Sequence, residues 1–196
     1  MTTTASCLAV LPGGRILTWA DTDWDDPRGA ALREAMDVEL SPRYAALRQG
    51  SPRPAPPSAG DVAVVVLALV DGKPAATGTL RRLPDRWEVK RLVVDADHRR
   101  LGLASRILAR LEDAARDHGA DELFLQTGNR QPEAIALYER EGWERIEVFA
   151  PYDPADGTWL DVPYLVGVDL TSRQGVERMD RWLAGAPDAD LDGLDL

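Results

Sequence analysis

The sequence contains a single cysteine, Cys7, among its 196 residues, so no intramolecular disulfide can form. One cysteine is typical of a reducing compartment, and we expect a cytoplasmic protein. No run of about 18 apolar residues occurs, so we expect no membrane span and no membrane partner. The first six residues, Met-Thr-Thr-Thr-Ala-Ser, lack the basic and apolar regions of a secretory signal.

Positive charge is also scarce. The chain has 23 Lys and Arg against 33 Asp and Glu, which gives a formal net charge of −10 at pH 7. Nucleic-acid binding depends largely on excess Lys and Arg, so we expect no nucleic-acid partner. One basic patch nevertheless occurs, formed by four arginines with no acid among them, Arg99, Arg100, Arg106 and Arg110. A basic patch in an acidic chain indicates a specific anionic ligand.

The basic patch begins in residues 89–104, which read as a buried strand, a short turn and the loop Arg99-x-x-Gly102-x-Ala104 before a helix. A helix start offers unpaired amides and a positive dipole end to an anion. The dinucleotide-binding pattern is absent, because only Gly102 is present where three glycines would be spaced. A loop ending in Gly-Lys-Ser/Thr is absent too, which excludes the usual nucleotide-triphosphate site.

A second segment, residues 123–146, reads as a strand, a helix and another strand. Residues 123–125 are apolar and indicate a buried strand. Pro132 suits the first turn of a helix, and Gly142 ends it before an alternating strand over residues 143–149. The apolar face of that helix consists of Ala134, Ile135, Leu137 and Tyr138.

Together, the two segments resemble the coenzyme-binding motifs of the GCN5-related N-acetyltransferase (GNAT) family. The strand, the Arg99-x-x-Gly102-x-Ala104 loop and the helix resemble the motif whose amides hold the diphosphate of acetyl-coenzyme A. Residues 134–143, Ala-Ile-Ala-Leu-Tyr-Glu-Arg-Glu-Gly-Trp, resemble the second motif, usually seen as A-x-x-x-Y-x-x-x-G-F. Both motifs occur in the family's order, and the resemblance covers roughly residues 8–170.

The resemblance implies an α/β (α+β) GNAT fold, in which a mixed central sheet of six to seven strands is flanked by helices. The hydrophobic patterns give the matching element order β-α-α-β-β-β-α-β-α-β-β. We expect a single acetyltransferase domain over residues 1–184, with a core at about 8–170 and a proline-rich loop at 50–60. Residues 185–196 are acidic and predict a disordered tail.

Specific residues mark several of these elements. Asp26-Pro27 signals the cap and first turn of a helix, and Ser41-Pro42 signals a second short helix through residue 49. Asp71-Gly72 predicts a hairpin. The other expected elements are paired strands at 8–11 and 15–20, the hairpin strands at 62–70 and 75–83, a strand at 86–95, a helix at 101–119, a strand parallel to its predecessor at 121–127, a strand near 160–170 and a helix at 172–184.

In functional terms, the resemblance implies direct transfer of an acetyl group from acetyl-coenzyme A to a primary amine, with no covalent enzyme intermediate and no metal. The acceptor is expected to be a small-molecule or peptide amine, and a homodimer stays open. A coenzyme-A-binding regulatory domain without transfer activity is the alternative from another functional class, because fold and donor alone do not fix function.

The resemblance also implies a set of donor-binding residues. Val93 and Val94 occupy the strand positions whose backbone pairs with the pantetheine arm in the family. Either Gln131 or Asn129 would make the contact that an asparagine often makes there. The arginine side chains either meet the adenosine phosphates or are ordinary solvated helix charges. The diphosphate would be held by the amides of Arg99, Arg100, Leu101, Gly102, Leu103 and Ala104.

Glu88 and Tyr138 are the candidate catalytic residues. A lysine-like amine has a pKa of about 10.4 and must lose a proton, for which Glu88 is the candidate base; a solvent-facing strand glutamate is the alternative. Tyr138 matches the family's tyrosine near the coenzyme sulfur; a core tyrosine is the alternative. A phenol of pKa about 10 is an uphill donor to a thiol of about 8.5, so hydrogen bonding is expected as much as proton transfer. Asp95 and Asp97 are weaker candidates for the base, and a turn or capping role is expected for His98.

In the family the acceptor usually lies near the first helix and its preceding loop, here residues 19–26. Four acids and two tryptophans in this loop would receive a cationic amine through charge and cation–π contact. The alternative is that Asp26 is a helix cap and the rest of the loop is solvated. The other side of the acceptor site would be closed by Tyr152, Trp159 and Tyr164.

Overall fold

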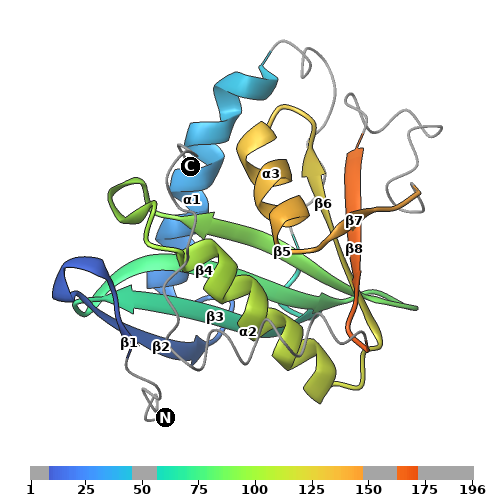
Figure 1. Ribbon diagram of the computed structural model, residues 1–196, viewed down its shortest axis with the longest axis horizontal. Helices are drawn as coiled ribbons and strands as arrows, with labels where there is room; N and C mark the ends of the chain where they lie inside the picture. Colours follow the sequence, from blue (N-terminus) through green and yellow to red (C-terminus); the bar gives the residue numbers. More distant parts are fainter. Residues whose placement is uncertain (1–8, 46–56, 148–162, 172–196) are drawn as a thin grey trace.

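The computed structural model describes residues 9–45, 57–147 and 163–171, whose strands form one sheet in the order β1-β2-β3-β4-β5-β6-β8-β7 (Figure 1). Neighbouring strands run antiparallel apart from β5 and β6, which are parallel as expected. The strands are β1 (Ala9–Val10), β2 (Ile16–Thr22), β3 (Val62–Val70), β4 (Lys73–Arg82), β5 (Trp87–Val94), β6 (Glu122–Gly128), β7 (Glu144–Arg145) and β8 (Pro163–Asp169). The helices are α1 (Pro27–Tyr44), α2 (Leu103–Asp117) and α3 (Pro132–Arg140), with short 3-10 helices η1 (Pro12–Gly14) and η2 (Ala96–His98).

Most elements form where the sequence predicts them. The hairpin between β3 and β4 turns at Asp71 and Gly72, whose φ angles of 51° and 78° suit the twist of a tight hairpin. Helix α1 begins behind Asp26, and β1 pairs with β2 across the Pro12–Gly14 turn. The mixed sheet flanked by helices is therefore confirmed.

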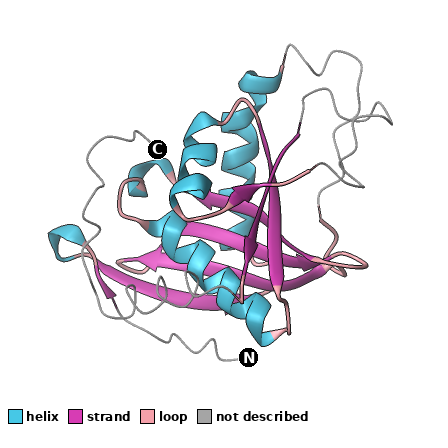
Figure 2. Cartoon of the chain, turned by 45° about the vertical axis from the view of Figure 1, so that its right-hand side comes forward, coloured by secondary structure: helices cyan, strands magenta, loops and turns pink. Residues whose placement is uncertain are grey.

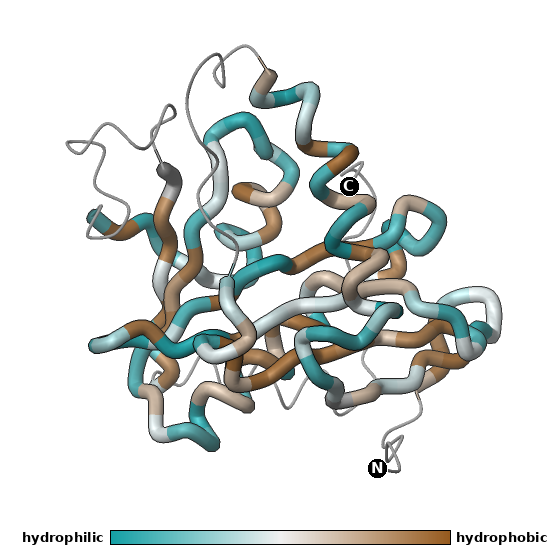
Figure 3. Tube along the Cα trace, turned by 180° about the vertical axis from the view of Figure 1, so that it is seen from behind, coloured by the Kyte–Doolittle hydropathy of each residue, from teal (hydrophilic) through white to brown (hydrophobic). Residues whose placement is uncertain are grey.

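Helices cover both faces of the sheet (Figure 2). Leu32 of α1 packs with Leu67 and Val93 in one apolar cluster. Helices α2 and α3 contribute Leu108 and Leu137 to the larger cluster on the opposite face. The most apolar segments of the tube lie in the central strands, whereas the loops at the rim are hydrophilic (Figure 3). This arrangement is what the almost wholly apolar β3 requires, because a strand in a covered sheet is buried on both faces.

A β-bulge in β5 interrupts its pairing with β4. The register shifts between Thr77 and Thr79, and Arg91 adopts a φ of 54° there. Gly78 lies opposite the bulge, and a Cβ built on it would sit 2.5 Å from Ile107 Cγ2 of α2. A bulge redirects the side chains that follow it. Gly78 thus lets α2 lie directly on the sheet where β5 changes direction.

Strands β5 and β6 diverge soon after they begin. They pair at three positions, the last of which joins Val89 to Leu125. Beyond this point β5 stays paired with β4 up to Val94, while β6 stays paired with β8 up to Gly128. Figure 1 shows the result: β5 runs across the molecule, whereas β6 and β8 stand upright beside each other and antiparallel.

Two expectations about the fold are corrected. Within the described residues the sheet has eight strands instead of six to seven, because the two-residue segments β1 and β7 both pair at its edges. Helix α1 continues through Pro42 to Tyr44, so Ser41-Pro42 does not begin a second helix. Pro42 lies in the last turn of α1, where the missing amide costs a single bond close to the helix end.

Several other expectations fall partly or wholly outside the described residues. Strand β7 is described over Glu144–Arg145, whereas the pattern predicted a strand over 143–149. The remaining expectations that cannot be compared are the rest of the second short helix, the proline-rich loop up to residue 56, the helix at 172–184 and the acidic tail.

We expect Gly78→Ala to lower the free energy of unfolding by about 1–3 kcal/mol, because the added methyl group overpacks the contact between β4 and α2. Gly60→Ala is the matched control, since the nearest atom to its Cβ is Ser58 Oγ at 3.8 Å. Urea unfolding followed by circular dichroism measures both variants. Equal stability of the two variants would contradict the close approach of α2 at Gly78.

Candidate functional site

The point where β5 and β6 diverge is spanned by a side-chain contact. Lys90 follows the last paired residue of β5, and its Nζ donates to Gln126 Oε1 on β6 at 3.1 Å. Beyond this contact the two facing strand edges are not paired with each other. A strand edge carries N–H and C=O groups that can bind an extended ligand.

Glu88 lies beside this point and is fully buried. Its carboxylate contacts Arg81 Nε at 2.5 Å and Lys90 Nζ at 3.0 Å. The alternative of a solvent-facing glutamate is therefore wrong. Burial lowers the pKa of Lys90, and the charge of Glu88 partly opposes that change. The pairing is physically necessary, because a buried charge without a partner is strongly unfavourable.

The cluster of Arg81, Glu88, Lys90 and Gln126 lies on the face of the sheet that carries α1. Trp87 and Val89, which alternate with Glu88 along β5, pack in the cluster beneath α2. Alternation along a strand then places Glu88 on the opposite face. The predicted base and the helix α1 thus share one side of the sheet.

The start of α2 has the form expected of an anion site. Its N-cap, Gly102, has a φ of 69°, makes no side-chain capping bond, and no acid occupies the first turn. Among the described residues, the amides of residues 100–104 have no hydrogen-bond acceptor. The first amides of a helix are unpaired unless a side chain or ligand accepts from them. This helix start can therefore bind an anion through its backbone.

The basic patch is only partly available for that role. Arg99 pairs with Glu39 of α1 at 2.6 Å, and the guanidinium of Arg110 lies 5.0 Å from the ring centre of Trp19. Arg100 is exposed, with a φ of 60°. Contacts within the chain thus engage two of the arginines expected at the phosphates.

The apolar donor residues contribute mainly through their backbone. Leu103 is buried in the core, and Leu101 packs against the same cluster. Val93 packs under α1, whereas Val94 packs on the opposite face. Ala104 also packs against the core. Any contact of these residues with a ligand between the strands would come from their peptide groups.

Tyr138 is a buried residue of α3, and it packs in the core as its alternative reading predicted. Its ring lies 6.2 Å from that of Trp143, whose Nε1 donates to the buried Glu112 at 3.1 Å. Burial raises the pKa of the Tyr138 phenol well above its usual range. The phenol is therefore protonated at neutral pH, and its role towards a coenzyme stays a prediction.

The two amide candidates before α3 differ in environment. Gln131 Nε2 donates to the Tyr44 hydroxyl at 3.1 Å, whereas Asn129 is exposed. Tyr44 comes so close that Gly128 has no room for a Cβ. An ion pair between Arg43 and Glu133 adds a further contact between the end of α1 and the start of α3.

The turn after β5 holds the weaker base candidates. His98 Nδ1 lies 2.7 Å from Asp95 Oδ2, and the His98 side chain is buried in η2. Asp97 is exposed in the same turn. The expected turn role of His98 is confirmed by this geometry.

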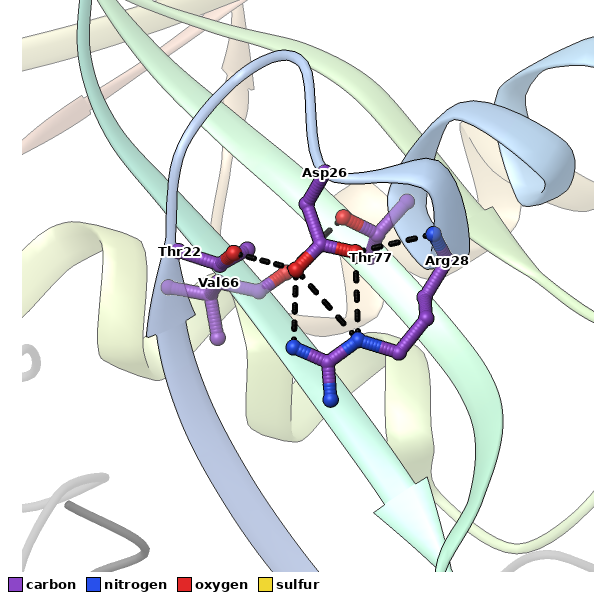
Figure 4. Close-up of polar contacts among 5 residues, drawn as sticks. All are labelled: Thr22, Asp26, Arg28, Val66 and Thr77. Atoms are coloured by element: carbon purple, nitrogen blue, oxygen red, sulfur yellow. Dashed lines mark hydrogen bonds and ion pairs between the residues drawn. The ribbon is translucent and has the colours of Figure 1, made fainter. Parts of the chain in front are cut away.

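The loop between β2 and α1 is organised by Asp26 (Figure 4). Its carboxylate accepts from the Arg28 amide at 2.8 Å, from the Arg28 guanidinium at 2.7 Å and from Thr22 Oγ1 at 2.6 Å. Beneath it, Thr77 Oγ1 donates to the Val66 carbonyl at 2.9 Å. Asp26 is therefore a helix cap, and the hydrogen bonds from Arg28 hold its pKa well below the usual range.

The two tryptophans of this loop lie on different faces. Trp19 is buried in the cluster beneath α2, whereas Trp24 stacks on Arg33 of α1. The expectation that both receive an amine is therefore wrong for Trp19. Of the residues expected to close the other side, Tyr164 lies in β8, and Tyr152 and Trp159 lie outside the described residues.

A model of the acetyltransferase (GNAT) family matches residues 18–143, which include both the diverging strands and the start of α2. The chain belongs to this family. The two motifs that carried the resemblance are thus those of a GNAT protein.

Two relatives share part of this GNAT chain. N-acetyltransferase 8 of Homo sapiens is 36% identical over 80 residues, which are 41% of the chain and 34% of that protein. IAA acetyltransferase of Azospirillum brasilense is 42% identical over 67 residues, which are 34% of the chain and 44% of that protein. The matches span less than half of either relative.

Solved structures share the GNAT fold over most of the chain. A crystal structure assigned as an acyl-CoA N-acyltransferase from Klebsiella pneumoniae is 28% identical, with a TM-score of 0.62, and covers 79% of the chain and 97% of its own length. A GNAT family acetyltransferase from Elizabethkingia anophelis with acetyl-CoA bound is 15% identical, with a TM-score of 0.55 over 78% and 97% of the two chains. At 15% identity, the similarity to the Elizabethkingia anophelis protein shows a shared fold and nothing more.

The described part of this GNAT chain contains neither a membrane-spanning helix nor a cluster of metal-ligating side chains. No described helix is long and apolar enough to cross a membrane. Within the same residues, no group of three or more His, Cys, Asp or Glu side chains is placed to hold a metal ion.

Sequence reasoning missed the polar partners of Glu88 in this GNAT site. Arg81 and Lys90 are charged residues that directly follow the apolar Leu80 and Val89 inside strands, which is the signal that could have identified them. Gln126 carries the same signal on β6. Which of them meet across the sheet depends on strand register, which the sequence alone does not specify.

We expect Asp26→Ala to destabilise the protein by about 1–2 kcal/mol at pH 7, because the α1 cap and its bonds to Arg28 are lost. The carboxylate has a lowered pKa in the folded state, so its stabilisation is present above the unfolded pKa of about 3.9 and declines as the pH falls below it. Urea unfolding at pH 7 and at lower pH should show the deficit narrowing in acid. Asp26→Asn, which keeps a capping oxygen, should lose less, and a deficit independent of pH would contradict the assignment.

Proposed function

We propose that the protein transfers the acetyl group of acetyl-coenzyme A to a primary amine by direct attack in a ternary complex. The observation that carries this proposal is the divergence of β5 from β6 beside the uncapped start of α2. An open strand edge pairs with an extended amide-bearing arm, and helix amides bind a diphosphate. Membership of the GNAT family supports the same conclusion.

The pantetheine arm would pair with the edge of β5 that faces β6. The Asp95 amide donates to the Ala75 carbonyl at 2.8 Å, so the peptide groups of Asp95 face β4. Because successive residues point to opposite strand edges, Val93 also faces β4 and Val94 faces the open edge. Of the predicted pair, Val94 would bond the arm, and Val93 would keep β5 packed under α1.

The diphosphate would bind at the start of α2. The amides of residues 100–104 point to no internal acceptor, and the Arg99 amide makes only a 3.5 Å contact with the Ala96 carbonyl. Backbone donors and the positive end of the helix dipole together favour a doubly charged phosphate group. Arg100 is exposed beside them and would add its charge.

Glu88 would accept the proton of the attacking amine, directly or through a water. Arg81 and Lys90 fix its carboxylate at the point where β5 leaves β6, next to the proposed thioester position. A fixed carboxylate near the reacting nitrogen is what general-base catalysis requires. Lys90 has a second role in this arrangement, because its contact with Gln126 also joins the diverging strands.

Tyr138 would donate a hydrogen bond to the departing sulfur. Its raised pKa makes full proton transfer to a thiolate less favourable than for an ordinary phenol. A neutral donor in a dry site still stabilises developing negative charge. Hydrogen bonding is therefore the proposed role, with solvent returning the proton to the thiol.

The proposal is tested by measuring thiol release from acetyl-coenzyme A over a panel of amines, amino acids and aminoglycosides. Calorimetric titration with coenzyme A measures donor binding in parallel. Thiol release that depends on the amine supports the proposal. Binding without release from any amine would favour the regulatory domain, and absence of binding would overturn the donor site itself.

We expect Tyr138→Phe to reduce kcat at least about tenfold, because removal of the hydroxyl leaves the departing thiolate without its donor. The affinity for coenzyme A should stay within about twofold, since the ring and its packing against Trp143 are kept. Steady-state kinetics and calorimetry give the two values. An unchanged kcat would rule out the assigned role.

We expect Glu88→Gln to reduce kcat/KM about a hundredfold at pH 7, with the deficit shrinking as the pH approaches the amine pKa of about 10. At high pH the free amine is already present and needs no base. Glu122→Gln, at an exposed glutamate of β6, controls for loss of one negative charge. A deficit of equal size at every pH, together with weaker coenzyme binding, would indicate a purely structural role for Glu88.

A further inference from the structure

A cavity of about 350 Å³ lies on the α1 face of the sheet. Its walls come from the end of the loop between β2 and α1, from the first half of α1 and from the bulge of β5. The bulge contributes Arg91, which immediately follows Lys90 at the point of divergence. The cavity therefore adjoins the proposed thioester position on the side that also carries Glu88.

Arg33 forms the inner wall of this cavity. Its side chain is buried, its guanidinium lies 4.0 Å from the ring centre of Trp24, and one nitrogen donates to the Trp24 carbonyl. The other terminal nitrogen, Nη1, is buried and has no hydrogen-bond partner among the described residues. This nitrogen is buried beside Gly29, where a Cβ would lie 3.0 Å from it. A buried donor without a partner costs free energy, so a shift of the guanidinium towards an acceptor in the cavity would be favoured.

Arg91 forms the second basic group of the cavity. Its Nη1 lies 2.6 Å from Asp37 Oδ1, and its side chain is 21% exposed. Burial lowers the pKa of Arg33, and the charge of Arg91 lowers it further. Arg33 and Arg91 both line this one cavity, so an anion bound there would be attracted by both guanidinium groups.

We propose that the acceptor is a small amine that also carries a carboxylate, and that Arg33 and Arg91 bind this carboxylate in the cavity. The inference rests on the proposed acetyl transfer and names its substrate class. The planar fork of a guanidinium matches a carboxylate in shape and charge. The cavity volume of about 350 Å³ is at the lower end of the range for ligand sites, about 300–1,000 Å³, which suits a small acceptor molecule.

The acids of the same cavity disfavour a second negative charge on such a molecule. Asp25 and Glu34 are exposed, and Asp37 pairs with Arg91. A simple dicarboxylate would be repelled by these acids, whereas an amino acid bound through its carboxylate carries a positive charge at its other end. The binding site thus favours an amino acid or a molecule of the same charge pattern.

The transfer step balances without a further reactant. The ammonium first gives a proton to Glu88, and the nitrogen lone pair attacks the thioester carbonyl carbon. The carbon–sulfur bond then breaks, and the bond pair leaves on sulfur. The nitrogen loses its second proton to solvent and the thiolate takes a proton from solvent, so that the one net proton released is the proton that Glu88 accepted. The products are an N-acetylated amino carboxylate and free coenzyme A.

The test compares amino acids with their own carboxamides and decarboxylated amines in the thiol-release assay. The wild-type chain should use the carboxylate-bearing acceptor with a kcat/KM at least about tenfold higher than either analogue. Arg91→Gln should raise KM for that acceptor about tenfold, with KM for acetyl-coenzyme A and rates for the carboxamide unchanged. Arg15→Gln is the control, because Arg15 pairs with Asp71 at the opposite end of β2.

Arg33→Lys provides a second variant, which keeps the charge but loses the fork and the stacking on Trp24. This variant should raise the KM for the acceptor. Its thermal unfolding midpoint is measured as well, so that a loss of binding can be distinguished from a loss of folding. Equal use of amines that lack a carboxylate, or an Arg91→Gln variant with unchanged KM, would overturn the inference and leave acetyl transfer standing. Thiol release from no amine at all would instead overturn the proposed function, and the substrate class with it.

Discussion

The structure depends on the point at which β5 stops pairing with β6. Three positions are paired, and beyond Val89 the edge of β5 turns away from its neighbour. Peptide groups in a protein interior need hydrogen-bond partners, so an edge of this kind is stable only beside water or a ligand. The bulge at Arg91 and the missing side chain of Gly78 allow β5 to change direction without disturbing α2. The open edge, the uncapped helix start and the cavity under α1 all follow from that local change in geometry.

The polar cluster at this point combines two demands. In the proposed mechanism Glu88 must lie beside the reacting amine, and a buried carboxylate must also be neutralised. Arg81 and Lys90 meet the second demand by pairing with that carboxylate. Under the proposed mechanism, the cluster would serve folding and chemistry through the same contacts.

The sequence predicted the parts of the molecule that depend on local signals. Asp26 as a cap, the turn at Asp71 and the loop before α2 follow from residues that are neighbours in the chain. The continuation of α1 through Pro42 was not predicted. A proline near a helix end is tolerated because few backbone hydrogen bonds remain there to be lost. The burial of Glu88 and the pairing of Arg33 with Trp24 could not be predicted, because they depend on which strand face a distant helix covers. The site was therefore predictable in its backbone motifs and not in its side-chain partners.

The end of helix α1 helps to hold the two diverging parts of the sheet at a fixed distance. The divergence separates the sheet into one part that ends at β5 and another that consists of β6, β8 and β7. Three paired residue positions of β5 and β6 join these parts at one end, and the contacts of Arg43 and Tyr44 with Glu133 and Gln131 join them at the other. Because contacts join the two parts of the sheet at both ends, the distance between β5 and β6 is held constant. We therefore expect the width between the strands to be set before any ligand arrives, so that binding of the proposed donor would require little reorganisation of the sheet.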